Sequence, residues 1–168
     1  LQSTSITTHN VHSVRLHVDR ILAHRPYIYM VQEANVAEAE VPLINAKALS
    51  AGYHTTFSQP TPLASDGISR IGRRLLIFVR LPGIPTEIAS YDDASCAYLM
   101  HSGRWVETFV PTGDGSKHFG AGNLYGYAGA STDTQLRKLN ETLLKYALAR
   151  MATFHDVPYY LGIDMNVD

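Results

Sequence analysis

The sequence predicts an α/β protein built on a mixed β-sheet that carries helices on one face. Three observations support this class. The first 57 residues alternate strand-like runs with helical periodicities, the middle of the chain holds short strands separated by turn-forming residues, and a long amphipathic helix precedes a final apolar run. Parallel strands need helical crossovers whereas short turns join antiparallel strands, so both kinds of pairing are expected in one sheet.

The N-terminal segment predicts a strand, a helix and a second strand. Residues 4–9 are rich in β-branched side chains, which favour a strand. The apolar residues that follow recur at helical spacing until the Arg-Pro pair at residues 25–26, which ends the helix. Residues 27–31 are apolar at successive positions, so apolar side chains would point to both faces of the strand. This pattern is typical of a strand buried on both faces.

The next elements repeat the alternation and then change to a loop. Residues 39–51 carry one apolar helical face and stop at Gly52, a residue that commonly ends helices. Residues 53–57 resume a strand. Residues 58–72 are rich in Pro, Ser, Gly and Thr and predict a surface loop before a strong apolar strand at residues 75–79.

The remainder predicts a meander followed by one crossover. The expected elements are strands at 86–91, 104–110 and 119–126, a helix at 133–154, and a last strand at 157–163. The Gly-Ala-Gly run at residues 120–122 precedes a strand and not a helix, which excludes a dinucleotide-binding loop. A sheet with helices on one face leaves its other face apolar, so packing requires a second sheet that we expect from outside these residues.

Composition limits the broad class without choosing a function. A chain of 168 residues with 45% hydrophobic and 17% charged residues is typical of one globular domain, and no apolar run is long enough for a membrane anchor. The net charge of −1 gives no overall attraction to a polyanion. The lone Cys96 cannot form an internal disulfide, which favours a reducing intracellular compartment, nucleus or cytoplasm, or else indifference to redox state.

Polar residues follow three of the predicted strands. Asn10 follows the first strand, Glu33 the second, and Asp164 with Asn166 the last. Open α/β sheets collect catalytic groups at such strand ends, and carboxylates there are suitable ligands for Mg²⁺, which prefers oxygen and leaves positions for phosphate. Each residue alone also suits a solvated strand exit or a turn. A zinc site from the histidines at 9, 12 and 17 is disfavoured because they straddle a strand-to-helix junction.

Four short segments resemble the first four signature motifs of the endonuclease/exonuclease/phosphatase superfamily, in the same order. They are residues 9–14 (HNVHSV), 31–34 (VQEA), 123–126 (NLYG) and 164–167 (DMNV). The resemblance implies a four-layer α/β sandwich, of which residues 1–168 would form the first layer as one incomplete domain. It also implies a divalent-metal-dependent phosphodiesterase.

The resemblance further implies a role for each matching residue. Glu33 matches the principal metal ligand, for Mg²⁺ or alternatively Mn²⁺, and Asn10 the residue that supports metal and phosphate binding. Tyr125 matches the tyrosine that contacts the scissile phosphate. Asp164 matches the acid that orients or deprotonates the attacking water, and Asn166 the amide that binds a phosphate oxygen.

A narrower resemblance points to DNA as the partner. Residues 103–106 (GRWV) and 123–129 (NLYGYAG) together look like the endonuclease segment of retroelement polyproteins, which implies a DNA endonuclease fused to a reverse transcriptase; an apurinic-type endonuclease is the related reading. Arg70, Arg73 and Arg74, in and after the predicted loop, are candidates for contact with the DNA backbone. The same arginines also suit a solvated hairpin.

The departures from the family pattern leave alternatives open. The late Asp and the Asp-His pair of the family have no counterpart after Asn166, His12 stands where Asp or Asn is frequent, and Ile163 replaces a usual Gly. Both ends of the chain look cut, and the isolated chain is expected to be weakly active or inactive. The alternatives are a non-catalytic remnant or binding module of the same fold, and a phosphatase acting on a lipid or inositol phosphate.

Overall fold

The computed structural model describes residues 5–63, 70–86, 94–112, 115 and 117–166. The first half of the chain forms β1 (Ile6–Asn10), α1 (Val14–Ala23), β2 (Ile28–Gln32), β3 (Val36–Ala37), the short 3₁₀ helix η1 (Glu38–Glu40), α2 (Val41–Ser50), β4 (Tyr53–Phe57), β5 (Thr61–Leu63), β6 (Arg70–Arg73) and β7 (Leu76–Arg80). The second half forms α3 (Ala94–His101), β8 (Trp105–Pro111), β9 (His118–Tyr125), α4 (Thr134–Ala152) and β10 (Tyr159–Asp164).

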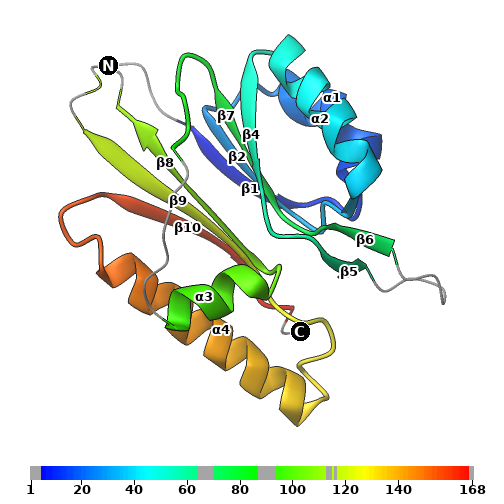
Figure 1. Cartoon of the computed structure of the whole chain (residues 1–168), viewed down its shortest axis with the longest axis vertical. Helices are drawn as coiled ribbons and strands as arrows, with labels where there is room; N and C mark the ends of the chain where they lie inside the picture. The colour runs from blue at the N-terminus through cyan, green and yellow to red at the C-terminus, as the bar shows by residue number, and fades with distance from the viewer. Residues whose placement is uncertain (1–4, 64–69, 87–93, 113–114, 116, 167–168) are drawn as a thin grey trace.

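Two mixed sheets face each other, and each carries helices on its outer side (Figure 1). The first sheet has the strand order β1-β2-β7-β4, and the second has the order β10-β9-β8. One parallel pair occurs in each sheet, β1 with β2 and β10 with β9, and the other neighbours are antiparallel. The prediction of an α/β fold with mixed sheets is confirmed.

The first sheet is the best anticipated part of the molecule. All five residues of β2 are buried, as expected for a strand covered on both faces. The apolar stripe of α1 packs on the outer face together with α2, through the buried side chains of Val14, Val18, Ile21, Leu22, Ile44 and Ala48. Burial of this stripe is the main force that holds both helices on the sheet.

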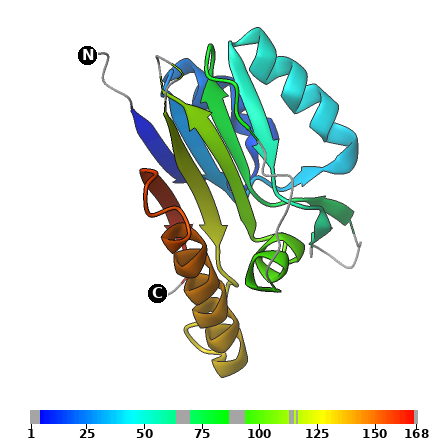
Figure 2. The ribbon, with the colours of Figure 1, turned by 60° about the vertical axis from the view of Figure 1, so that its left-hand side comes forward.

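The second sheet corrects one expectation about layers. Packing does require a sheet on the inner face of the first, but that sheet comes from the chain's own β8, β9 and β10. Ile28, Met30 and Ile77 on the first sheet pack directly against Val106 and Ala121 on the second. These three strands form a sheet separate from the first (Figure 2). The sequence pattern predicted them as strands without indicating which sheet they join.

Helices α3 and α4 cover the outer face of the second sheet and complete four layers. Asp133 caps α4 by accepting hydrogen bonds from the backbone N–H groups of Gln135 and Leu136, at 2.7 and 3.1 Å. Near the other end of α4, Arg150 forms a buried ion pair with Glu107 of β8 at 3.0 Å. These contacts fix the helix along the sheet. None of the helices that the structure describes is long and apolar enough to cross a membrane.

The structure also differs from the sequence expectations in three places. The expected loop at residues 58–72 contains β5 and β6, which join β3 in a small antiparallel sheet. Of the expected strand at 86–91, Thr86 pairs with Phe109 as an isolated bridge, and the rest lies outside the described residues. Helix α3 was not predicted, because its eight residues have no clear polar face and their helical state depends on packing.

Candidate functional site

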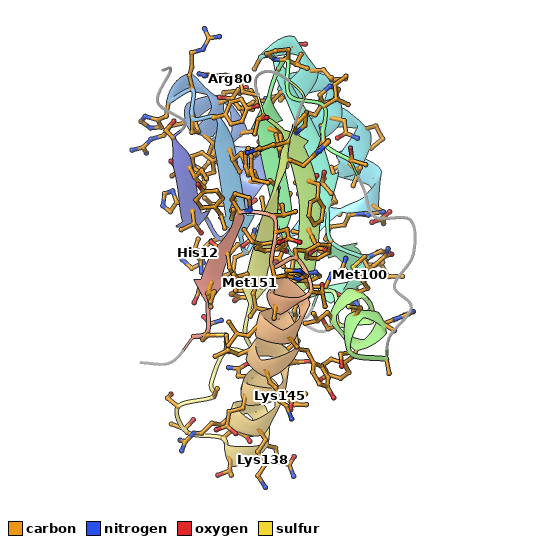
Figure 3. All side chains as sticks on the ribbon, turned by 90° about the vertical axis from the view of Figure 1, so that its left-hand side faces the viewer. His12, Arg80, Met100, Lys138, Lys145 and Met151 are labelled. Atoms are coloured by element: carbon orange, nitrogen blue, oxygen red, sulfur yellow. The ribbon has the colours of Figure 1, made fainter. Side chains whose placement is uncertain are left out.

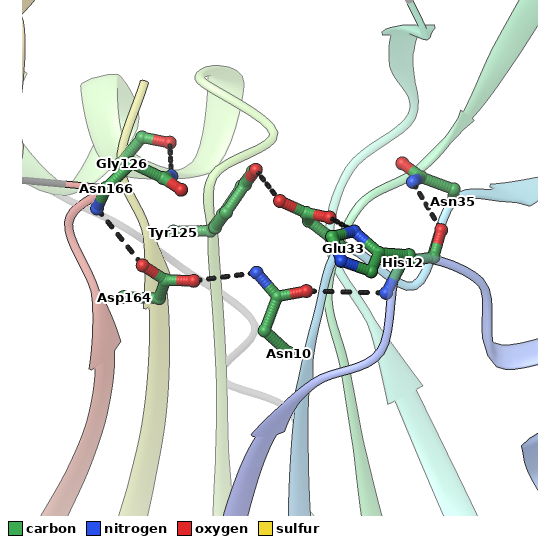
Figure 4. Close-up of polar contacts among 8 residues, drawn as sticks. All are labelled: Asn10, His12, Glu33, Asn35, Tyr125, Gly126, Asp164 and Asn166. Carbon is green, nitrogen blue, oxygen red and sulfur yellow. Dashed lines mark hydrogen bonds and ion pairs between the residues drawn. The ribbon is translucent and has the colours of Figure 1, made fainter. Parts of the chain in front are cut away.

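The strand register brings the predicted polar residues to one edge of the two sheets. Asn10 lies opposite Gln32 in the parallel β1–β2 pair, and Glu33 follows directly. Asp164 lies opposite Tyr125 in the parallel β10–β9 pair. Because parallel strands end at the same edge and the two sheets face each other, four separate chain segments converge there (Figure 4).

Asn10 links the two sheets through its side chain. Its Nδ2 donates a hydrogen bond of 2.8 Å to Oδ2 of Asp164, and its Oδ1 accepts one of 3.3 Å from the backbone N–H of His12. The amide is therefore oriented with its donor toward Asp164 and its oxygen toward the Glu33 side of the site. An oxygen held in this way is available to a cation or to its bound water.

Glu33 is held as a carboxylate by a ring of donors. The Tyr125 hydroxyl donates to Oε1 at 2.5 Å, and Oε2 contacts Nδ1 of His12. Burial is the largest single influence and opposes ionisation, but the hydrogen bonds from Tyr125, Asn10 and His12 together outweigh it and lower the pKa of the Glu33 carboxyl. Glu33 is thus negatively charged at neutral pH while its side chain is only 17% exposed.

Tyr125 is the neutral donor of the group. Burial, followed by its hydrogen bond to Glu33 and the charge of that carboxylate, raises the pKa of the Tyr125 hydroxyl to about 12. Its ring is 5% exposed and lies 5.4 Å from the guanidinium of Arg104. The hydroxyl therefore keeps its proton under ordinary conditions and can donate it to an acceptor that enters the site.

Asp164 and Asn166 form a tight turn beside Tyr125. The backbone N–H of Asn166 donates to Oδ1 of Asp164 at 3.0 Å, and its Nδ2 donates to the carbonyl of Gly126 at 3.0 Å. The Gly126 N–H in turn donates to the Asp164 carbonyl at 2.6 Å. These bonds fix the carboxylate of Asp164 from one side while Asn10 holds it from the other.

Non-glycine residues in the left-handed region gather at this edge. His12, Glu33, Asn35 and Asn166 have φ values of 55, 51, 48 and 50°. Asn35 also donates to the carbonyl of His12 at 2.8 Å, which supports the turn at His12. Such conformations are uncommon outside glycine and are retained where the surroundings impose them, frequently at functional sites.

Below the site lies a buried polar contact that sequence reasoning missed. Gln32 donates through Nε2 to Oδ1 of Asn123 at 2.6 Å, and Asn123 donates to the carbonyls of Val31 and Leu76 at 3.0 and 3.3 Å. Asn123 is fully buried between the two sheets. Both residues stand in the motifs discussed above, yet only the packing of the sheets brings them together.

The arginines predicted for the DNA backbone have different surroundings. Arg73 forms an ion pair with Glu38 at 2.7 Å and donates to the carbonyl of Ser58, and Arg74 donates to the carbonyl of Pro62. The side chain of Arg70 lies outside what the structure describes. Their role in nucleic-acid binding stays a prediction.

Arg104 is a cation that sequence reasoning did not assign to the site. It stacks on the Tyr127 ring at 3.7 Å and donates to the Gly126 carbonyl at 2.6 Å. Burial and then the charge of Arg74 lower the pKa of Arg104, so the two arginines lie near each other on the Tyr125 side of the site. Its place depends on the β8–β9 register, which residue spacing does not reveal.

The donor set fits a hard divalent cation. Glu33, Asp164 and Asn10 offer oxygen atoms at one edge, and Mg²⁺ is commonly bound by one or two carboxylates with waters and phosphate completing its shell. Among the residues with described positions, no three His, Cys, Asp or Glu side chains come together as a closed metal cage. A cation held by this set would need further ligands, such as water or phosphate, to complete its shell.

Neither a protein-family model nor a curated protein matches the sequence. Solved structures do resemble it. The catalytic domain of human Nocturnin, determined with a bound sulfate anion, has 15% identity and a TM-score of 0.61, covering 92% of this chain and 56% of that one. The endonuclease domain of TRAS1, a telomere-specific non-LTR retrotransposon, has 10% identity and a TM-score of 0.56, covering 99% and 60%. ANGEL2, a 2',3'-cyclic phosphatase, has 16% identity and a TM-score of 0.53, covering 89% and 47%.

The likeness extends over nearly all of this chain, which spans about half the length of the structures that it matches. At identities of 10 to 16% such a likeness establishes architecture. It agrees with the order of the four sequence motifs and with the two facing sheets and their outer helices. The chain therefore has the fold of the endonuclease/exonuclease/phosphatase superfamily.

Proposed function

We propose that the chain hydrolyses phosphodiester bonds in DNA with the help of a divalent cation, Mg²⁺ or Mn²⁺. The observation that carries this proposal is the convergence of Glu33, Asn10, Tyr125 and Asp164 from four strand ends into one hydrogen-bonded group. A partly buried carboxylate, a second carboxylate and fixed neutral donors are the parts that phosphoester hydrolysis requires. The fold supports the same class, because solved structures that share it include an endonuclease domain and a cyclic phosphatase.

Glu33 and the amide oxygen of Asn10 would hold the cation. When bound, the cation supplies positive charge against the phosphate oxygens and makes a nearby water more acidic. Both carboxylate oxygens of Glu33 already accept hydrogen bonds, from Tyr125 and His12. Each carboxylate oxygen has a second lone pair, so Glu33 could bind a cation and keep these bonds, and His12, whose side chain is 87% exposed, would also have room to turn away.

Asp164 would take the proton of the attacking water. The new bond joins the water oxygen to phosphorus, the ester bond opposite it breaks, and the proton passes to an Asp164 carboxylate oxygen. Asn10 and the backbone N–H of Asn166 hold that carboxylate in place, which reduces the entropy lost on reaching the reactive geometry.

Tyr125 and Asn166 would stabilise the charge that grows on the phosphate oxygens. Tyr125 is suited to this role because its raised pKa keeps the hydroxyl protonated, and a protonated hydroxyl can turn from Glu33 to phosphate. The Asn166 amide donates to the Gly126 carbonyl and also to the Tyr125 hydroxyl, and the second of these bonds would be exchanged for one to an incoming oxygen. Fixed donors of this kind contribute about 10²–10³-fold to rate each.

DNA is proposed over other phosphoesters because of the retroelement-like segments around Arg104 and Tyr125 and the likeness to the TRAS1 endonuclease domain. The stacked pair of Arg104 and Tyr127 beside the site provides a cation and an aromatic ring, a combination suited to a nucleic-acid strand. A lipid or inositol phosphate is the competing substrate and belongs in the same assay.

The test is nicking of supercoiled plasmid DNA by the natural full-length protein, with Mg²⁺ or Mn²⁺ and with a chelator, beside release of phosphate from an inositol phosphate. Glu33→Gln and Asp164→Asn should abolish nicking, whereas Glu141→Gln, an exposed carboxylate on α4, should retain it. Mn²⁺ binding, measured by electron paramagnetic resonance, gives a readout independent of turnover and should be lost in Glu33→Gln. A wild-type full-length protein that neither binds Mn²⁺ nor nicks DNA would refute the proposal.

A further inference from the structure

A groove of about 390 Å³ lies beside the proposed site, between α1 and the edge strand β1. It shares Asn10 and His12 with the site, so the two regions are continuous. The groove is lined on the strand side by His9 and Tyr29, which share a hydrogen bond of 2.9 Å. The helix side is lined by His17, Arg20 and His24.

Among the described residues, the groove is lined by basic side chains and by no acidic ones. Five of its lining residues are histidine or arginine, and none is aspartate or glutamate: His9, His12, His17, Arg20 and His24. Each of these side chains can donate hydrogen bonds from nitrogen, and Arg20 carries a positive charge at any ordinary pH. The chain as a whole has a net charge of −1, so this concentration of donors is not a consequence of a basic composition.

The helix α1 separates its charges between two faces. His17, Arg20 and His24 follow an i, i+3, i+7 spacing and lie on the face toward β1. Arg15 and Asp19 instead form ion pairs with Glu40 and Lys47 on the α2 side, at 2.7 and 2.8 Å. The acidic residue of the helix is thus engaged away from the groove, and within the described part of the chain Arg20 has no carboxylate partner.

We propose that this groove binds a second phosphate of the nucleic-acid strand whose neighbouring phosphate occupies the site at Asn10 and Tyr125. The proposal rests on the function proposed above and narrows its substrate to a chain with several phosphates. A strand that crosses the β1 edge at Asn10 meets the reactive group on one side and Arg20 on the other. Arg20 is the principal contact, because its guanidinium can bind phosphate oxygens through two N–H groups.

The test measures binding without hydrolysis. A fluorescein-labelled single-stranded DNA oligonucleotide is titrated in the presence of a chelator, and the affinity is followed by fluorescence anisotropy over a range of salt concentrations. Loss of one phosphate contact should weaken binding and reduce the slope of log K against log salt by about 0.7. Arg20→Ala should show this change, and the double variant His17→Ala/His24→Ala a weakening of affinity.

Lys145→Ala is the matched control, because it also removes one exposed positive charge from a helix but lies on α4 away from His12 and the groove (Figure 3). It should leave the salt slope unchanged. An Arg20→Ala slope equal to that of the wild type, an equal change in Lys145→Ala, or a wild type that does not bind the oligonucleotide would each overturn the groove proposal.

The two proposals fail in distinguishable ways. If the slope of log K against log salt falls in Arg20→Ala but the wild type never nicks DNA, phosphate binding in the groove is supported and the hydrolytic function is refuted. Nicking that depends on Glu33, together with an unchanged slope in Arg20→Ala, supports the function and refutes the groove. Circular dichroism of each variant checks that the exposed substitutions leave the fold intact.

Discussion

Asn10 and Asp164, 154 positions apart in the chain, are joined by a hydrogen bond of 2.8 Å from the amide of one to the carboxylate of the other. Asn10 ends the edge strand of the first sheet, and Asp164 ends the edge strand of the second. The bond therefore spans the two sheets at their open edges. It couples the position of the proposed proton acceptor to the segment that carries His12, which in turn contacts Glu33.

Asn10→Ala should show how much this bond contributes to the stability of the fold and how much to the positioning of Asp164. Hydrogen bonds to charged groups contribute about 1.5–3 kcal/mol to stability. Because the pair is only half-buried, the substitution should lower the free energy of unfolding by that amount or less. Nicking should fall by about 10²-fold, as expected for loss of one fixed group at a reacting centre. Chemical denaturation and plasmid nicking measure the two effects.

Asn45→Ala provides the control for Asn10→Ala. Asn45 lies on α2 and is hydrogen-bonded to Thr55, so its removal also deletes a half-buried amide contact. It should lower stability without a comparable loss of nicking. Equal losses of activity in the two variants would mean that Asn10 acts only through the stability of the fold.

Tyr125→Phe should raise the pKa of Glu33. The substitution keeps the buried ring and removes the hydroxyl that donates to Oε1, so the carboxylate loses one of the hydrogen bonds that stabilise its charge. The shift can be followed by carbon NMR of the Glu33 carboxyl, with Tyr127→Phe as the control on the same segment. Nicking should fall by about 10²–10³-fold in Tyr125→Phe. A Glu33 pKa that stays in place would show that the hydroxyl does not stabilise the carboxylate in solution.

Glu33 should make the free energy of unfolding depend on pH in the acidic range. Its pKa in the folded protein is below the ordinary value of 4.5, so the unfolded state binds more protons near that pH. The stabilising contribution is complete above pH 4.5 and is lost as pH falls through the lower, folded pKa. Glu33→Gln should therefore lose less stability than the wild type between pH 4.5 and the folded pKa, as measured by urea unfolding at a series of pH values. Parallel curves for the two proteins would contradict this.

The sequence predicted the strands of the site better than it predicted their partners. The continuous apolar run of β2 and the terminal position of Glu33 follow from local pattern, and so does the end of β10 at Asp164. The fold class followed from the order of these elements. What local pattern cannot provide is the face on which a strand packs, which is why β8, β9 and β10 were not recognised as the second sheet.

The missed contacts share a physical cause. His12 and Glu33, which are in contact, both have a left-handed backbone, and neither residue type predicts that conformation. Arg104 reaches Tyr125 and Tyr127 only because β8 and β9 pair in one register. Both depend on tertiary structure, whereas the strand-end positions of Asn10 and Glu33 depend on their own segments.

The buried contact between Gln32 and Asn123 should contribute to the free energy of unfolding. Asn123→Ala removes the acceptor of the Gln32 amide, and burial without a partner costs about 1–3 kcal/mol. Gln32 retains a bond to Thr8 at 2.7 Å, which should keep the loss toward the lower end. A double-mutant cycle with Gln32→Leu, measured by urea unfolding, should give a non-zero coupling energy. Additive losses would mean that the two amides are stabilised independently.

The close approach of the two sheets gives the most direct test of how the fold positions the site. Gly162 lies on β10, two residues before Asp164, and faces the first sheet. A Cβ atom added there would lie 2.8 Å from Sδ of Met30 and 3.0 Å from Oγ1 of Thr8. Met30 is 1% exposed, so its side chain has little space into which to move. Gly162→Ala should therefore lower stability by about 1–3 kcal/mol, the usual cost of overpacking a core.

The same substitution should impair the site, because a β10 displaced from the first sheet carries Asp164 away from Asn10. Removing the obstructing sulfur should reverse both effects. The double variant Gly162→Ala/Met30→Val should recover nicking and lose less stability than the sum of the single variants, since the new methyl group then occupies the vacated volume. If the two losses simply add and nicking stays low, the separation of the sheets at Gly162 does not control the distance between Asn10 and Asp164.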